Sequence, residues 1–105
     1  MWLFTTRGMF SVVRVPDTDE MQIRARRRSH LENLRAIGLK AKILETPDGD
    51  YGFRCVVSRA QWECVAAVLA REVDYPNFKN AATKCGAAYA RALHDVWARM
   101  SELQP

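Results

Sequence analysis

The stretch from Pro47 to Val73 constrains the fold more than any other part of the chain. It opens with Pro47-Asp48-Gly49-Asp50, a turn sequence in which proline presets φ and glycine accepts a positive φ. From Tyr51 to Val57 apolar residues alternate with others, which predicts a half-buried strand. An amphipathic helix follows, because apolar residues recur at helical spacing. These are Trp62, Val65, Ala66, Leu69 and Val73.

Two serines are predicted to cap helices. Ser58 and Gln61 have the spacing of a capping box, in which the hydroxyl accepts from a free N–H and the amide side chain reaches back. Ser29 and Glu32 repeat this spacing ahead of a second helical pattern, which we expect to end at Gly38. The apolar positions of that pattern are Leu31, Leu34 and Ile37.

The remaining segments of the first half read as strands. Trp2 to Val15 is expected to form either one long strand kinked at Gly8 or two short strands that meet there. After a polar turn at 16–20, Met21 to Arg26 alternates apolar and polar residues, with a basic outer face. A further strand is expected from Ala41 to Thr46.

The order of elements recurs along the chain, so that each half reads as strand, turn, strand and helix. We therefore predict one α+β domain over residues 1–105, with a four-stranded, mainly antiparallel sheet built from two strand–strand–helix halves and helices on one face. Apolar residues at spacings of three and four from Phe78 to Leu103 predict a short helical turn and then a long C-terminal helix from about Gly86.

Composition excludes several classes. The chain has 105 residues, 49% of them hydrophobic and 27% charged, which suits one domain with a buried core. No apolar run approaches about 18 residues, so we expect no membrane span. The apolar start, Met1 to Phe4, lacks the features of a signal peptide. Three cysteines without a short spacing favour reduced thiols and a cytoplasmic protein.

Cysteine and histidine positions do not predict a metal or catalytic site. Cys55, Cys64, Cys85, His30 and His94 show no C-x-x-C or H-x-x-x-H spacing. We expect Cys55 and Cys85 in the core and His30 at the surface of a helix start. No phosphate-binding glycine loop, G-x-S-x-G or H-E-x-x-H motif occurs, so no catalytic residue and no cofactor are predicted.

The most suggestive feature is a cluster of arginines on the predicted strands and the helix start. Its members are Arg24, Arg26, Arg27, Arg28 and Arg54. On an exposed sheet face they could contact phosphates of single-stranded nucleic acid. Equally, long arginine stems cover the solvated face of any sheet. Tyr51 and Phe53 are expected in phase with the core, which argues against base stacking beside the arginines.

A second candidate site is the segment between the last two helical patterns. Tyr75, Asn77 and Lys79 could form a recognition loop. The alternative is a connector in which Asn77 caps a helix and Phe78 anchors it, and we favour this alternative.

The chain resembles a group of small uncharacterised bacterial proteins. The resemblance is carried by Trp2 to Thr6, Phe10 to Val13, Asp74 to Lys79, and His94 with Trp97, and it covers most of the chain. It implies no known activity and no functional residues.

Three function classes stay open. The net charge of +4 permits a non-enzymatic module that binds nucleic acid or a nucleoprotein. A protein-binding regulator or inhibitor, of the kind found on phages and mobile elements, would show a sizeable exposed apolar patch. A small enzyme, which we favour least, would need a pocket with convergent polar groups. The sequence predicts neither the partner nor the oligomeric state.

Overall fold

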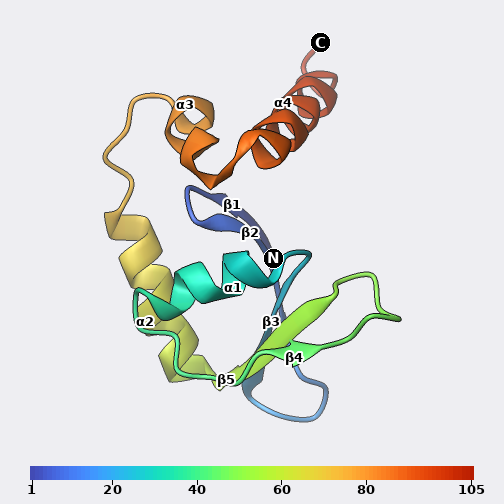
Figure 1. The fold of residues 1–105 in the computed structure, drawn as a ribbon, viewed down its shortest axis with the longest axis vertical. Helices are drawn as coiled ribbons and strands as arrows, with labels where there is room; N and C mark the ends of the chain where they lie inside the picture. The colour runs from blue at the N-terminus through green and yellow to red at the C-terminus, as the bar shows by residue number, and fades with distance from the viewer.

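The protein is a five-stranded antiparallel sheet with helices on one face and a long helix across one end (Figure 1). The computed structural model describes residues 1–105. The strands are β1 (Trp2–Thr5), β2 (Gly8–Arg14), β3 (Glu20–Ala25), β4 (Leu44–Glu45) and β5 (Phe53–Ser58), in the order β1-β2-β3-β5-β4. The helices are α1 (Arg28–Arg35), α2 (Arg59–Arg71), α3 (Phe78–Ala82) and α4 (Ala87–Ser101), with a 3₁₀ turn, η1 (Thr83–Cys85), before α4.

The predicted α+β class and antiparallel sheet are confirmed, but the sheet has a fifth strand. For the N-terminal segment, the alternative of two short strands that meet at Gly8 is confirmed. Gly8 follows the turn between them and has a φ of 135°. The strand expected from Ala41 to Thr46 shrinks to Leu44–Glu45. The residues before it bury Leu39 and Ile43 in the core, so only the end of this segment runs beside β5.

The two halves of the chain are both hairpin–helix units. β2, β3 and α1 form the first, and β4, β5 and α2 form the second. The units join along β3 and β5, which pair antiparallel from Glu20 opposite Ser58 to Ala25 opposite Phe53. This register places Arg24 directly opposite Arg54.

The main core lies between the sheet and the helices α1 and α2. Its members include Phe10, Ile23, Leu31, Leu34, Cys55, Trp62 and Val65. The predicted stripe of α2 is confirmed from Trp62 to Leu69, but Val73 lies beyond the helix and is exposed. Burial raises the pKa of Cys55 to about 11, so its thiol stays protonated at neutral pH.

One of the two predicted capping boxes is half right and the other is wrong. Ser58 Oγ accepts from the Gln61 N–H at 3.1 Å, whereas the Gln61 side chain accepts from the Lys40 N–H instead. Helix α1 begins at Arg28, before Ser29, and has no side-chain cap. The connection from β3 is so short that Ser29 falls inside the first turn, where its hydroxyl cannot serve as the cap.

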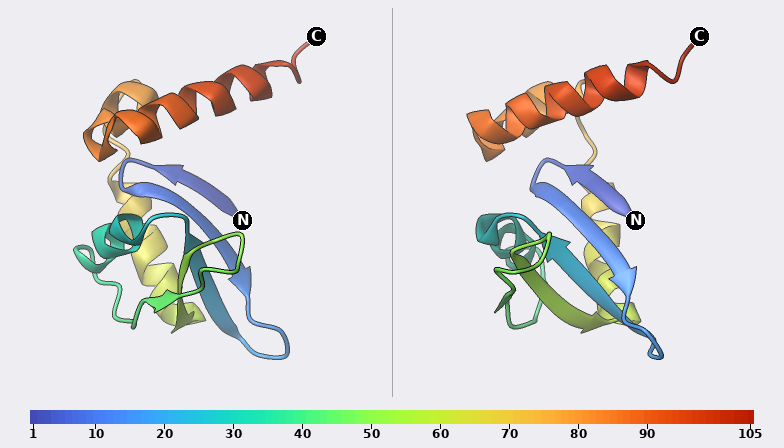
Figure 2. Two further views of the ribbon diagram at one scale, coloured as in Figure 1. Left: turned by 45° about the vertical axis from the view of Figure 1, so that its right-hand side comes forward. Right: turned by 90° about the vertical axis from the view of Figure 1, so that its right-hand side faces the viewer.

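The C-terminal segment crosses the β1–β2 hairpin on the side away from the main core. Gly86 separates η1 from α4 with φ of 107°, as the predicted break requires. Tyr89 and Leu93 of α4 pack with Phe4 and Met9, which alternate with the core residues of their strands. The C-terminal half of α4 extends past the sheet (Figure 2), and its apolar side chains Trp97 and Met100 are exposed, as is Leu103 just beyond the helix. None of the helices has the length and apolar character needed to cross a membrane.

Candidate nucleic-acid interface

The face of the sheet opposite α1 and α2 carries an ordered row of side chains, here called the arginine row. The strand register places its five members side by side: Trp2, Ser11, Arg24, Arg54 and Leu44. Trp2 is 69% exposed and Leu44 is 42% exposed, while both arginines are half-buried. The neighbouring row on the same face consists of Val13, Gln22 and Val56. Neither row contains a carboxylate.

Arg54 is fixed within the sheet by three hydrogen bonds. It donates from Nε to Thr46 Oγ1 at 3.0 Å, from Nη1 to Gln22 Oε1 at 3.1 Å, and from Nη2 to the Tyr51 carbonyl at 3.4 Å. Like charges directly opposite each other destabilise a sheet. These bonds to neutral acceptors hold Arg54 in place beside Arg24.

Arg24 and Arg26 both lie over the ring of Tyr51. The guanidinium carbons are 4.8 and 4.6 Å from the ring centroid, which is cation–π geometry. Arg24 donates to Ser11 Oγ at 2.7 Å, and its buried Nε has no partner. Tyr51 is buried, with 4% of the residue exposed, as its expected phase with the core requires, but its ring packs under these arginines rather than in the main core. β5 begins only at Phe53, so the alternation does not extend back to Tyr51, whereas Phe53 does pack against the core.

The last two members of the predicted cluster point to different surroundings. Arg27 is the N-cap residue of α1, is exposed, and makes no side-chain hydrogen bond there. Arg28 turns toward acidic neighbours, with ion pairs to Glu32 at 3.0 Å and Glu45 at 4.0 Å. The structure thus brings Arg24, Arg26 and Arg54 together around Tyr51, leaves Arg27 nearby, and engages Arg28 elsewhere.

A pocket of about 400 Å³ opens beside the arginine row, between the β1–β2 hairpin and α4. Five rings line it, those of Trp2, Phe4, His30, Tyr51 and Tyr89, and Arg26 and Arg27 line it as well. No carboxylate, thiol or serine contributes to its wall. Sequence reasoning missed this pocket because its residues come from four separate segments that only the tertiary fold brings together.

His30 is buried in the wall of this pocket, so its expected surface position is wrong. Only 6% of the residue is exposed, because α1 starts early and turns the ring against Gly8, which has no side chain. Met9 donates its N–H to Nδ1 at 3.3 Å, whereas Nε2 is buried without a partner. Burial, aided by the positive charge of Arg27, lowers the pKa of His30 below its ordinary 6.5. The ring is therefore neutral at pH 7, with its proton on Nε2.

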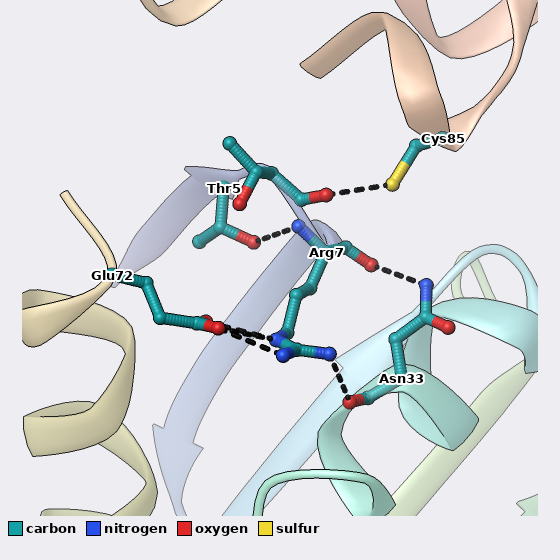
Figure 3. Close-up of polar contacts among 6 residues, drawn as sticks. Thr5, Arg7, Asn33, Glu72 and Cys85 are labelled. Carbon is teal, nitrogen blue, oxygen red and sulfur yellow. Dashed lines mark hydrogen bonds and ion pairs between the residues drawn. The ribbon is translucent and has the colours of Figure 1, made fainter. Parts of the chain in front are cut away.

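A polar network fixes the hairpin that forms one wall of the pocket (Figure 3). Arg7, in the β1–β2 turn, donates to the Glu72 carboxylate at 2.8 Å from Nε and 2.7 Å from Nη2. Arg7 also donates to the Asn33 carbonyl, and Asn33 Nδ2 donates back to the Arg7 carbonyl at 2.9 Å. The turn is thereby tied to both α1 and α2.

The same hairpin holds the C-terminal helices. The Cys85 thiol donates to the Thr6 carbonyl at 2.9 Å, and the Tyr89 hydroxyl donates to the Thr5 carbonyl at 2.8 Å. Cys85, expected in the core, is only partly buried. Desolvation raises the pKa of its thiol. These bonds position α4 over the pocket.

The segment from Tyr75 to Lys79 has the geometry of a connector. Asn77 Oδ1 accepts from the Asn80 N–H at 3.0 Å and caps α3, and the Tyr75 ring packs on Phe78 at 5.9 Å. Lys79 Nζ lies 4.3 Å from the ring centroid of Trp97. Each side chain has its own intramolecular partner, and the three do not converge on one site. Phe78, expected to anchor the helix, is half-buried and packs against the small cluster of Ala82, Tyr89 and Leu93.

No group of three or more histidine, cysteine, aspartate or glutamate side chains is placed to hold a metal ion.

Comparison with other proteins assigns the chain to no family. No protein-family model matches the chain, and no match is found among curated proteins or among solved structures.

Proposed function

We propose that the protein is a non-enzymatic module that binds single-stranded nucleic acid across the arginine row and the adjoining Arg26 and Arg27. The observation that supports this most is the pair Arg24 and Arg26 on the ring of Tyr51, beside the exposed indole of Trp2. Proteins that bind single strands combine cations for the phosphates with aromatic rings on which bases stack. The arginine row offers Arg24 and Arg54 as cations and the exposed Trp2 indole as a stacking ring, whereas Tyr51 is buried beneath the arginines.

The distribution of charge favours one path for an anionic backbone. Asp48 and Asp50 occupy the β4–β5 turn, where the Asp50 carbonyl accepts from Arg26, and Glu20 lies at the far end of β3 on the same face. No ion pair engages Arg24, Arg26 or Arg27, so their charges are available to an anionic backbone. The first turn of α1 adjoins Arg27 without a side-chain cap, and free N–H groups at a helix start favour anions.

The test is fluorescence anisotropy with short single- and double-stranded RNA and DNA at two salt concentrations. We expect single strands to bind, and we expect affinity to fall steeply with salt because binding releases counterions. The double variant Arg26→Gln/Arg27→Gln should weaken binding to all sequences and flatten the salt slope by about one unit per lost phosphate contact.

The matched control is Arg71→Gln/Arg91→Gln, which removes the same charge from exposed positions on α2 and α4. Equal weakening by both double variants would place the phosphate contacts away from Arg26 and Arg27 and would contradict this site. If no strand binds at low salt, the proposal fails. That result would favour a protein partner instead, for which the exposed Trp97 and Met100 of α4 and Leu103 beyond it supply apolar surface.

A further inference from the structure

We propose that the pocket between the β1–β2 hairpin and α4 binds a single nucleotide, with the base among the rings and the phosphate at Arg26 and Arg27. This inference rests on the proposed function, because it names the part of a nucleic acid that the site beside the arginine row accepts. The shared ligand chemistry is that of a nucleoside phosphate, whether free or at the end of a strand.

The lining of the pocket favours a flat ring system as occupant. Its volume of about 400 Å³ falls in the range of small-molecule sites. Aromatic side chains form its walls on several sides: Trp2 and Phe4 from β1, Tyr51 from the turn before β5, and Tyr89 from α4. Bases of every kind have a π face that stacks on such rings.

His30 supplies the polar contact that the apolar walls lack. It is 94% buried, since 6% is exposed, and its Nε2–H has no partner in the protein. A buried donor without an acceptor is costly, and because Nε2 has almost no accessible surface, a ligand acceptor meets it only after a small shift of the adjacent Tyr89 ring. Nucleobases carry carbonyl oxygens and ring nitrogens in their plane, which are acceptors of this kind.

The two arginines set the orientation of the nucleotide. Both are exposed, whereas His30 is buried, so the anionic end of a ligand lies outward and the base inward. Arg26 is already held by Tyr51 and by the Asp50 carbonyl, to which its Nη1 donates at 2.6 Å. Arg27 makes no side-chain hydrogen bond within the protein and is free to meet a phosphate.

The experiment is a ¹H–¹⁵N NMR titration of the protein with AMP, UMP, adenosine, uridine and decanoate, followed by anisotropy with short homopolymeric strands. We expect the monophosphates to shift the His30 ring and Trp2 indole signals together. Arg27→Gln should weaken AMP binding several-fold and leave adenosine binding unchanged, because only the phosphate reaches that guanidinium.

A variant that fills the pocket, compared with one that adds the same side chain elsewhere, separates loss of binding from loss of folding. Ala92 lines the pocket on the exposed side of α4, so Ala92→Phe should fill the site and weaken mononucleotide binding by roughly tenfold or more. Ala98 is also exposed on α4 but lies outside the pocket, and Ala98→Phe is the control. Circular dichroism should show both variants folded.

The outcomes separate this inference from the function on which it rests. Strand binding without any mononucleotide binding, and unaffected by Ala92→Phe, overturns the pocket and leaves the arginine row in place. Mononucleotide binding that Ala92→Phe abolishes supports the pocket, and if strands bind no more tightly than mononucleotides, the strand-binding function is overturned instead. Signal shifts with decanoate but not with nucleotides overturn the assigned ligand class.

Discussion

The contact between Gly8 and His30 shows how single positions determine the pocket. Gly8 has φ of 135°, a conformation that residues with a side chain rarely adopt. A Cβ atom placed there would come within 2.3 Å of His30 Cγ. Glycine is therefore required for two reasons: the backbone of the turn has a positive φ, and the His30 ring occupies the space of a Cβ atom.

We predict that Gly8→Ala lowers the free energy of unfolding by about 2 kcal/mol or more, because it adds a collision to the backbone strain. Gly86→Ala is the control, since φ there is 107° but a Cβ would meet nothing within 4 Å. Urea titrations of both variants would check this. A loss from Gly86→Ala as large as that from Gly8→Ala would show that the His30 contact has no energetic role.

His30 should also make stability depend on pH. Its pKa is lower in the folded protein than its ordinary 6.5, through burial and Arg27, while the Met9 N–H and the Tyr89 ring face the same imidazole. The unfolded chain thus binds the proton more readily, so the stabilisation is present above about pH 6.5 and declines as the pH falls below it. Unfolding curves from pH 8 to 5 should show this decline, reduced in His30→Gln and retained in His94→Gln.

At the scale of elements, the two hairpin–helix units differ most at their strand-to-helix junctions. β5 runs directly into α2, so Ser58 ends the strand and caps the helix. β3 stops at Ala25 and α1 begins at Arg28, which moves Ser29 past the cap position. Identical spacing in the sequence therefore gives a cap in one half only, because the end of the preceding strand decides where the helix starts.

Ser58→Ala should destabilise the protein by about 1 kcal/mol, since it leaves a helix N–H without its acceptor. Ser29→Ala removes an exposed hydroxyl that caps nothing and should change stability by less than about 0.5 kcal/mol. The midpoints of denaturant unfolding compare the two. A larger loss from Ser29→Ala than from Ser58→Ala would contradict this assignment of the caps.

At the scale of the whole molecule, local patterns predicted the elements better than their assembly. Alternation and helical spacing were enough for β3, β5, the α2 stripe and the break at Gly86, because these depend on near neighbours in the chain. The position of Tyr51 under two arginines and the burial of His30 depend on contacts between distant segments. The ion pair of Arg7 with Glu72 is of the same kind, and no spacing rule reveals it.

The hydrogen bonds that Arg7 makes to Glu72 and Asn33 should stabilise the molecule as a whole. Arg7→Ala leaves Glu72 and the Asn33 carbonyl without their donor, and we expect a loss of about 2 kcal/mol. Arg99→Ala breaks the exposed pair with Glu102 and should have little effect. Hydrogen exchange should show faster opening of the β1–β2 hairpin in Arg7→Ala alone, and unchanged exchange there would contradict a clamping role.

The same pair adds a second pH dependence. The hydrogen bonds from Arg7 lower the pKa of Glu72 below its ordinary 4.5, so this stabilisation is complete above that pH and is lost as the pH falls further.

The joining of two hairpin–helix units along β3 and β5 has a consequence for how the chain folds. Within each unit, contacts form between residues close in sequence, which is fast. The ladder from Glu20–Ser58 to Ala25–Phe53 instead closes a loop that contains all of α1. The chain loses the conformational entropy of that loop before the contacts of the ladder can stabilise it. We therefore expect the rate-limiting step to be the encounter of two preformed hairpins, with substitutions in β3 and β5 slowing folding and those in α4 mainly accelerating unfolding.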